Sequence, residues 1–284
     1  MRTIKQQHRA VSAPIDDLIT YRALPTRSVE HLDPFLFLNH HGPQVYKANN
    51  RGLPFGPHPH RGFETVTFIL EGDIMHEDTG GHQSVINAGG IQWMTAGRGL
   101  IHAEVSSPEF KRQGGPLEIL QLWVNLPARH KMTEPRYVGL QEPDIPRVSL
   151  DEGRVSLQAV SGEWAGTPGA VQPLADIALA TVHFKAGGTL TLSIPAAHTI
   201  FFYVVRGRLR VQEQETEALR LVEFNHDGDD LRIEALSDAV LLLGHALPFH
   251  EPIVAYGPFV MNTQQEIQQA YQDYQAGKFG QWRG

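Results

Sequence analysis

Cysteine is absent from the 284 residues of this chain. Disulfides, thiolate nucleophiles and iron–sulfur clusters are therefore excluded, and any bound metal must be held by histidine and carboxylate side chains. The sequence also lacks a run of the ~18 apolar residues that cross a bilayer. Its N-terminus lacks the ~7–15-residue apolar core of a signal peptide. We therefore expect a cytoplasmic protein.

Positive charge is scarce as well, because 24 lysines and arginines face 31 aspartates and glutamates, for a net charge of −7. Binding to nucleic acid or to an anionic membrane depends on clustered positive charge, so we expect neither as a partner. A Gly-x-Ser-x-Gly elbow is missing, which removes the main sequence signal for a serine hydrolase. Histidine, by contrast, is plentiful at 15 residues.

Short β-strands are the dominant pattern. Thr65–Leu70 alternates, with Val66 and Phe68 on one face, and Leu117–Val124 is a second long strand-like run. Glycine-rich turns such as Glu71–Asp73 separate these runs. Many short strands joined by such turns predict an all-β sandwich or barrel.

An internal repeat predicts two similar domains. Phe68–Met75 resembles Tyr203–Arg210 at an offset of 135 residues, and the proline-rich stretch at 125–146 is a plausible junction. We expect a first domain at 1–133 and a second at 134–284.

The second domain is expected to hold no metal. The same offset places Ser193 and Pro195 where the first copy has His58 and His60. It is expected to end in a helix at 263–276, because Thr263 and Glu266 form a capping-box pattern.

Two histidine motifs give the clearest sign of chemistry. His58 and His60 are separated by one residue, and so are His102 and Glu104. Residues i and i+2 of a strand point to the same face, so two such strands facing each other would gather three imidazoles and one carboxylate. That set suits one first-row divalent metal with open coordination positions.

Two alternatives to this ligand set arise from nearby residues. Glu64 could replace Glu104 as the carboxylate, but Glu104 shares a strand face with His102, so we expect Glu64 to lie behind the ligands. A second polar cluster surrounds the Thr79–Gly81 turn, where a solvated turn is favoured over a second metal site. That cluster consists of His76, Glu77, Asp78 and His82.

At these residues the chain resembles the pirin family of bicupins, within the cupin superfamily. The resemblance covers nearly the whole chain, and the segments that carry it are Pro57–Val66, Gln92–Gly99, His102–Glu104, Glu118–Pro127 and Glu251–Asn262. It implies two tandem cupin (jelly-roll) domains with a short C-terminal helix. It also implies that His58, His60, His102 and Glu104 are the ligands of an iron ion.

The resemblance further implies a function. Several pirins show quercetin 2,3-dioxygenase activity, so we expect an Fe(II)-dependent enzyme that cleaves flavonols such as quercetin with O2 uptake and CO release. Zn, Ni, Mn, Co and Cu also suit the ligands. Glu104 is the candidate base for the flavonol hydroxyl, and Phe55, Phe63 and Trp93 are candidates for an apolar substrate wall.

The alternative is a non-catalytic, redox-sensing regulatory protein that binds a protein partner in a metal-dependent way. We expect a monomer, because two domains within one chain can bury area against each other.

Overall fold

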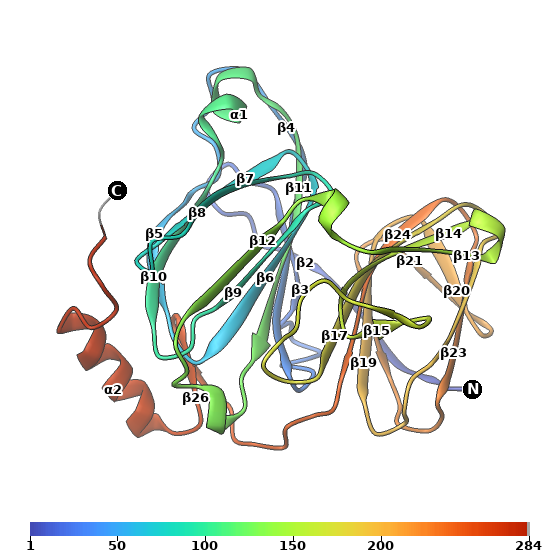
Figure 1. Ribbon diagram of the computed structural model, residues 1–284. Coiled ribbons are helices and arrows are strands. Elements are labelled where there is room, and N and C mark those ends of the chain that lie inside the picture. Colours follow the sequence, from blue (N-terminus) through green and yellow to red (C-terminus); the bar gives the residue numbers. More distant parts are fainter. Residues whose placement is uncertain (283–284) are drawn as a thin grey trace. The chain divides into compact units, whose positions relative to one another are not determined.

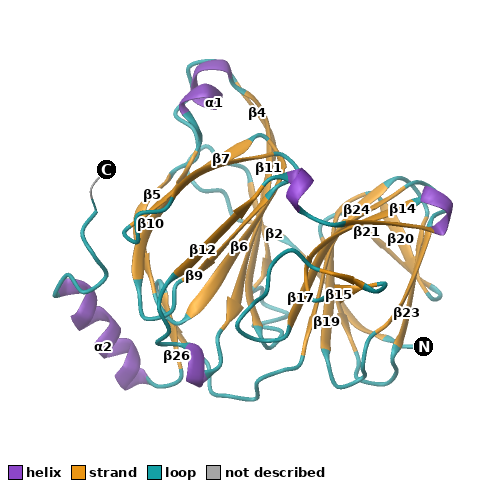
Figure 2. Ribbon diagram, viewed as in Figure 1, coloured by secondary structure: helices purple, strands orange, loops and turns teal. Residues whose placement is uncertain are grey.

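The structure is a computed structural model and describes residues 1–282. Strands make up most of it, with short helices between and after them (Figure 1, Figure 2). The two α-helices of the described residues are α1 (Pro108–Gln113) and α2 (Gln264–Gln275). None of the described helices is long and apolar enough to cross a membrane. The expected all-β class is confirmed.

The chain groups into two compact units, and each is discontinuous in sequence. The histidine-bearing unit contains Ser12–Thr20, Phe35–Glu142 and the described residues from Phe249 onward. The second unit contains Met1–Val11, Tyr21–Pro34 and Pro143–Pro248.

The histidine-bearing unit has one large and one small antiparallel sheet. The large sheet runs β12-β9-β6-β11-β4 within this unit, and the small sheet runs β5-β10-β7-β8. Alternation of apolar and polar residues along these strands buries one face of each sheet. The strands are β4 (Phe35–Tyr46), β5 (Phe55–His60), β6 (Phe63–Glu71), β7 (Asp73–Asp78), β8 (Gln83–Asn87), β9 (Ile91–Thr95), β10 (Leu100–Val105), β11 (Gly115–Asn125) and β12 (Arg136–Leu140).

The second unit repeats this plan. Its large sheet runs β1-β22-β19-β24-β17-β14-β13, and its small sheet runs β18-β23-β20-β21. Strands β17 to β24 therefore correspond, in order, to strands β4 to β11 of the histidine-bearing unit. Their bounds are β1 (Ile4–Arg9), β13 (Arg147–Leu150), β14 (Val155–Ser161), β17 (Ile177–Phe184), β18 (Thr189–Ser193), β19 (Thr199–Arg206), β20 (Arg208–Val211), β21 (Gln214–Glu217), β22 (Arg220–Phe224), β23 (Asp230–Ala235) and β24 (Ala239–Ala246).

The remaining elements are short. Two-stranded ribbons pair β15 (Glu163–Trp164) with β16 (Thr167–Pro168), and β25 (Val254–Tyr256) with β26 (Phe259–Met261). The other short pieces are β2 (Val11–Ser12), β3 (Thr20–Leu24) and 3₁₀ turns at Ala128–His130, Glu142–Asp144 and Asp151–Gly153.

The grouping differs from the expected division at 133/134 because the N-terminal strand belongs to the second unit and the C-terminal segment belongs to the histidine-bearing unit. The N-terminal strand β1 forms its backbone hydrogen bonds with β22, so it extends the second unit. The described residues from Phe249 onward pack with the histidine-bearing unit instead. No local sequence pattern reports such long-range strand pairing.

The C-terminal segment is anchored by an apolar cluster. Phe259, Met261, Ile267, Ala270 and Phe279 pack together, with Ile101 of β10 against them. Helix α2 lies beside β26 (Figure 1). The expected capping box is confirmed at its start, where the Thr263 hydroxyl accepts from the Glu266 backbone N–H and the Glu266 carboxylate accepts from the Thr263 N–H.

A close backbone approach ties this segment to the end of β5. The Val260 N–H donates to the Arg61 carbonyl at 3.0 Å, and the buried Lys131 ammonium donates to the carbonyls of Gly62 and Val260 at 2.9 and 3.0 Å. Gly62 has φ +88°, and a Cβ there would lie 2.0 Å from the Val260 oxygen. Only glycine suits this position.

Replacing Gly62 with alanine should therefore lower the free energy of unfolding by at least about 2 kcal/mol, through backbone strain and the clash with Val260. Urea unfolding of the metal-free protein measures this. Gly56→Ala is the matched control, because nothing lies within 4 Å of its added Cβ. Equal losses in the two variants would contradict the assignment.

Candidate metal centre

Strands β5 and β10 place the two histidine motifs opposite each other. They are antiparallel neighbours, with His58 directly across from His102 and His60 across from Leu100. On its other side β10 pairs with β7, which sets Glu104 opposite His76. The alternation of each motif and the register between the strands thus turn three imidazoles toward one point.

The structure brings His58, His60 and His102 together. One potential ligand atom from each lies within 4.8 Å of the others. Their ring centroids are 4.4 Å apart for His58 and His102, 4.8 Å for His58 and His60, and 5.0 Å for His60 and His102. Among the described residues this is the one cluster of three or more such side chains. Whether they bind a metal stays a prediction.

Hydrogen bonds select the tautomers of two of the rings. His58 Nδ1 lies 2.7 Å from the Gly56 carbonyl, and His60 Nδ1 lies 3.2 Å from the Pro258 carbonyl. A carbonyl only accepts, so each Nδ1 carries the proton and each Nε2 keeps its lone pair. Such a backbone partner on the far nitrogen is the usual support of a metal-bound histidine.

Burial keeps the inner imidazoles neutral. It lowers the pKa of His60 to about 3, with a further contribution from His58. It also holds the pKa of His102 well below its ordinary value, and the neighbouring imidazoles of His60, His58 and His76 add to the effect. Both nitrogens of His102 are buried and lack a hydrogen-bond partner among residues 1–282. Neutral imidazoles whose nitrogen lone pairs are not engaged in hydrogen bonds are suitable ligands for a metal cation.

Glu104 is buried beside this group but is not part of it. Its Oε1 accepts from the Thr67 hydroxyl at 3.0 Å and from the Gln92 amide, and its Oε2 accepts from the Gln121 amide at 2.5 Å. These donors are all neutral. A buried carboxylate of this kind gains from a nearby cation, so its surroundings also fit a bound divalent ion.

Glu64, the alternative carboxylate, lies on β6 and likewise falls outside the histidine cluster. Its Oε1 accepts from the Thr95 hydroxyl at 2.5 Å. Burial raises the pKa of Glu64 to about 7, against a smaller opposing effect of that hydrogen bond. It is therefore a carboxyl group that is partly protonated near neutral pH.

Aromatic rings border the cluster on the side of His60. Phe63 and Trp123 contact the His60 ring at centroid distances of 4.9 and 5.3 Å, and lie 4.4 Å from each other. Phe37 stacks on Trp123 at 4.7 Å. Of the expected wall residues, only Phe63 has such a ring contact with a cluster histidine.

The other two expected wall residues make no ring contact with a cluster histidine among the described residues, although Phe55 pairs with Glu104 across β5 and β10. Phe55 contacts His41 at 5.1 Å, and Trp93 is buried within the large sheet. Sequence reasoning missed Trp123, although the alternation of β11 places it on the same face as Gln121. The two-residue spacing of Gln121 and Trp123 could have indicated from the sequence that Trp123 faces the site.

The C-terminal segment also supports the cluster. Besides the Pro258 carbonyl at His60, Asp273 of α2 forms an ion pair with Arg61 at 2.9 Å. The Arg61 guanidinium lies 4.7 Å from the centre of the Phe279 ring and donates to the Arg98 carbonyl. These contacts fix the chain directly after His60. The contacts with Pro258, Asp273 and Phe279 were missed because these residues are about 200 positions away from His60 and Arg61 in sequence.

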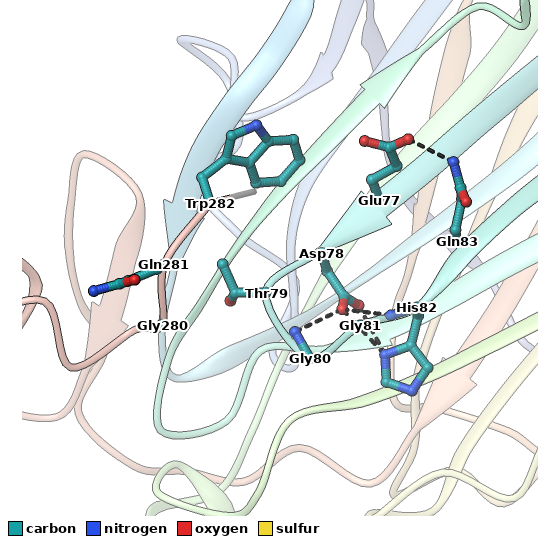
Figure 3. Close-up of a pocket in the computed structure, with 10 residues that line it drawn as sticks. All are labelled: Glu77, Asp78, Thr79, Gly80, Gly81, His82, Gln83, Gly280, Gln281 and Trp282. Atoms are coloured by element: carbon teal, nitrogen blue, oxygen red, sulfur yellow. Dashed lines mark hydrogen bonds and ion pairs between the residues drawn. The ribbon is translucent and has the colours of Figure 1, made fainter. Parts of the chain in front are cut away.

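The second polar cluster is a hydrogen-bonded turn. Asp78 accepts from the backbone N–H groups of Gly80 and His82 and lies 3.1 Å from His82 Nδ1 (Figure 3). Its other oxygen lies 2.9 Å from His76 Nε2. A pocket of about 640 Å³ opens beside this turn, lined by Glu77, Asp78, Thr79, Gly80, Gly81, His82, Gln83, Gly280, Gln281 and Trp282 (Figure 3). The carboxylate is already satisfied by the turn, but the side chains of His76 and Asp78 are buried, at 0% and 1% exposure, rather than solvated as we expected.

Comparison with protein families agrees with these features. The family model Pirin matches residues 17–124, and the model of the Pirin C-terminal cupin domain matches residues 179–280. The chain belongs to the pirin family. The resemblance inferred from the motifs is thus confirmed, and the two β units are its two cupin domains.

Individual relatives cover almost the entire chain. A Pseudomonas aeruginosa protein named provisionally as a quercetin 2,3-dioxygenase is 39% identical over 266 residues, which are 94% of this chain and 92% of that protein. Human Pirin is 36% identical over 269 residues, covering 91% and 87% of the two chains. A crystal structure of quercetin 2,3-dioxygenase from Acinetobacter baumannii matches with a TM-score of 0.91 at 36% identity, covering 99% of each chain.

The pKa of Glu64 leads to a pH-dependent prediction for the metal-free protein. The folded state holds a proton up to about pH 7 that the unfolded state releases near pH 4.5, so stability falls as pH rises through this window. Glu64→Gln mimics the protonated form. It should match the parent at pH 4.5 and exceed it by roughly 2 kcal/mol at pH 8, measured by urea unfolding. A difference that does not vary with pH would refute the raised pKa.

Proposed function

We propose that this pirin-family protein is a metal-dependent dioxygenase that cleaves flavonols such as quercetin, with O2 uptake and CO release. The observation that carries the proposal is the cluster of His58, His60 and His102, whose lone pairs converge beside a buried carboxylate. The likeness to a solved quercetin 2,3-dioxygenase over the full chain supports the choice of reaction.

The proposed ligands are His58, His60 and His102 through ring nitrogens, with Glu104 as the fourth. Nitrogen ligands with one carboxylate suit Fe(II), which we propose as the working metal. Zn, Ni, Mn, Co and Cu also fit, and divalent affinities generally favour Cu and Zn over Fe. Four protein ligands leave open positions for a substrate and O2.

When bound, the metal would act as a Lewis acid that makes the flavonol hydroxyl more acidic. Glu104 is the group that we propose accepts this proton, because it is the carboxylate adjacent to the imidazoles. Gln92 and Gln121 each donate to one of its oxygens and so fix the position of the carboxylate. Proton transfer to a positioned base of this kind contributes about 10²–10⁴-fold to rate.

Substrate would approach from the side of His58. That histidine is partly exposed, whereas His60 and His102 are buried. On the neighbouring side, Phe63 and Trp123 present aromatic surface next to His60. A flat aromatic substrate can pack on such rings, so we add Trp123 to the apolar wall proposed for Phe55, Phe63 and Trp93.

A second candidate function is a non-catalytic, metal-dependent regulatory protein that binds a protein partner. The observation in its favour is the 36% identity to human Pirin over 91% of this chain, a relative whose name states no reaction. Full iron occupancy without any quercetin turnover would favour this alternative.

The first test is quercetin turnover by protein that is reconstituted anaerobically with Fe(II). We expect O2 uptake and CO release in equal amounts. His58→Ala should lose metal and activity together, because it removes one of three nitrogen ligands. His82→Ala is the matched control, since His82 is exposed on the Asp78 turn, and it should retain both. Turnover by the His58 variant at the parental rate would refute the assignment.

The role of Glu104 is tested by Glu104→Gln, which keeps the shape of the side chain and removes its charge and basicity. We expect metal affinity to fall about 10–100-fold, and kcat at saturating metal to fall by about 10² or more. Glu64→Gln is the comparison and should bind metal normally. Metal loss in the Glu64 variant alone would reverse the assignment of the carboxylate ligand.

A further inference from the structure

The second unit contains a pocket that the proposed reaction does not use. Its volume is about 480 Å³. The segment that joins β14 to β17, including the β15–β16 ribbon, forms most of its wall, which is completed by one histidine just before β19 and one in β24. The lining residues are Gly162, Glu163, Pro168, Gly169, Val171, Gln172, Pro173, Ala175, Asp176, Ile177, Ala178, His198 and His245.

The strand repeat shows which residues of the first, histidine-bearing unit correspond to His198 and His245. Trp123 pairs with Thr65 in the first unit, and His245 pairs with Ile200 in the second. Thr65 and Ile200 are related by the 135-residue offset of the repeat, so His245 takes the place of Trp123.

The same offset relates Phe63 to His198. The second unit thus has a pair of imidazoles where the first has the aromatic contact beside its histidine cluster. In both units the pair touches, at 4.4 Å between the centroids of Phe63 and Trp123 and at 5.2 Å between those of His198 and His245. Two rings are thus in contact at the equivalent position of both units, but the pair is apolar in the first unit and polar in the second.

The two imidazoles share a hydrogen bond. Their Nδ1 atoms are 3.0 Å apart, so one ring donates and the other accepts. The donor ring then has an accepting Nε2, and the acceptor ring has an Nε2–H. Burial lowers the pKa of both His245, to about 4, and His198, so the pair is neutral at pH 7. It offers one acceptor and one donor and no charge.

Surrounding charges argue against an ionic ligand. The buried Arg2 guanidinium donates to the carbonyls of Ala196 and His198 and lowers the pKa of both histidines, so a metal cation at the pair would be repelled. Asp176 and Glu163 line the same pocket, and they would repel an anion. A neutral ligand that both donates and accepts hydrogen bonds remains.

The walls indicate that this ligand is aromatic. Val171, Pro173, Ala175 and Ile177 supply apolar surface, and the Trp164 ring lies 5.2 Å from the His245 ring. An apolar pocket with a few convergent polar groups is typical of small-molecule sites. Phenolic hydroxyl groups match the imidazole pair, because each can donate and accept.

We propose that this pocket binds a neutral hydroxylated aromatic compound of the phenol or catechol class, with its hydroxyl groups on His198 and His245. The site is independent of the histidine cluster of the first unit and of the proposed reaction. It requires no metal.

Catechol is the probe, titrated into the full-length, metal-free protein and followed by the NMR signal of the Trp164 indole N–H. That group donates to the Ser161 carbonyl at 2.8 Å next to the pocket, and its signal is identified with Trp164→Phe. We expect a saturable shift with a Kd on the order of 1 mM, as befits so small a ligand. His58→Ala should leave this shift unchanged.

His245→Phe keeps a ring against Trp164 and removes both nitrogens, so it should fold and weaken catechol binding at least tenfold. His198→Phe should do the same, and His31→Ala, at an exposed histidine of the same unit, should not. Absence of a saturable shift in the parent, or catechol binding by both phenylalanine variants that is as tight as that of the parent, would overturn the proposal. So would binding of glucose without catechol, or a bound zinc ion that only these two variants lose.

Discussion

The antiparallel register between β5 and β10 is the constraint on which the candidate metal centre depends. With His58 opposite His102, three imidazoles point into one space. A slip of one residue between the strands would turn one of the two motifs to the other face of the sheet. The register is held at both ends, because the pairing of β10 with β7 fixes one side and the close approach of Gly62 to Val260 fixes the chain just beyond His60.

Burial then gives this geometry its chemical character. It keeps His60 and His102 unprotonated, and the backbone carbonyls at His58 and His60 leave the Nε2 lone pairs available. Glu104 adds a buried carboxylate whose donors are neutral. The imidazole lone pairs and the neighbouring carboxylate together form a set of groups that would suit one divalent cation. The two units share a strand plan, but only the first has these side chains.

Much of this could be predicted from the sequence because it is local. Alternation placed His58 and His60 on one face, the Thr263 and Glu266 spacing gave the helix start, and a short repeat gave the two units. What was missed depends on pairing between distant segments. The exchange of chain ends, the Pro258 carbonyl at His60 and the Arg61–Asp273 pair join residues about 200 positions apart. Trp123 was missed because apolar aromatic residues occur in cores and in pockets equally often, so only tertiary contacts distinguish Trp123, which touches His60, from Trp93.

The most direct test of the account is the coordination of iron in the Fe(II)-reconstituted protein, measured by X-ray absorption at the iron edge. We expect one iron per chain, with the scattering of three imidazoles and additional oxygen ligands, and loss of that iron in His58→Ala. Iron bound with a first shell of oxygen alone, or an unchanged spectrum in His58→Ala, would contradict it.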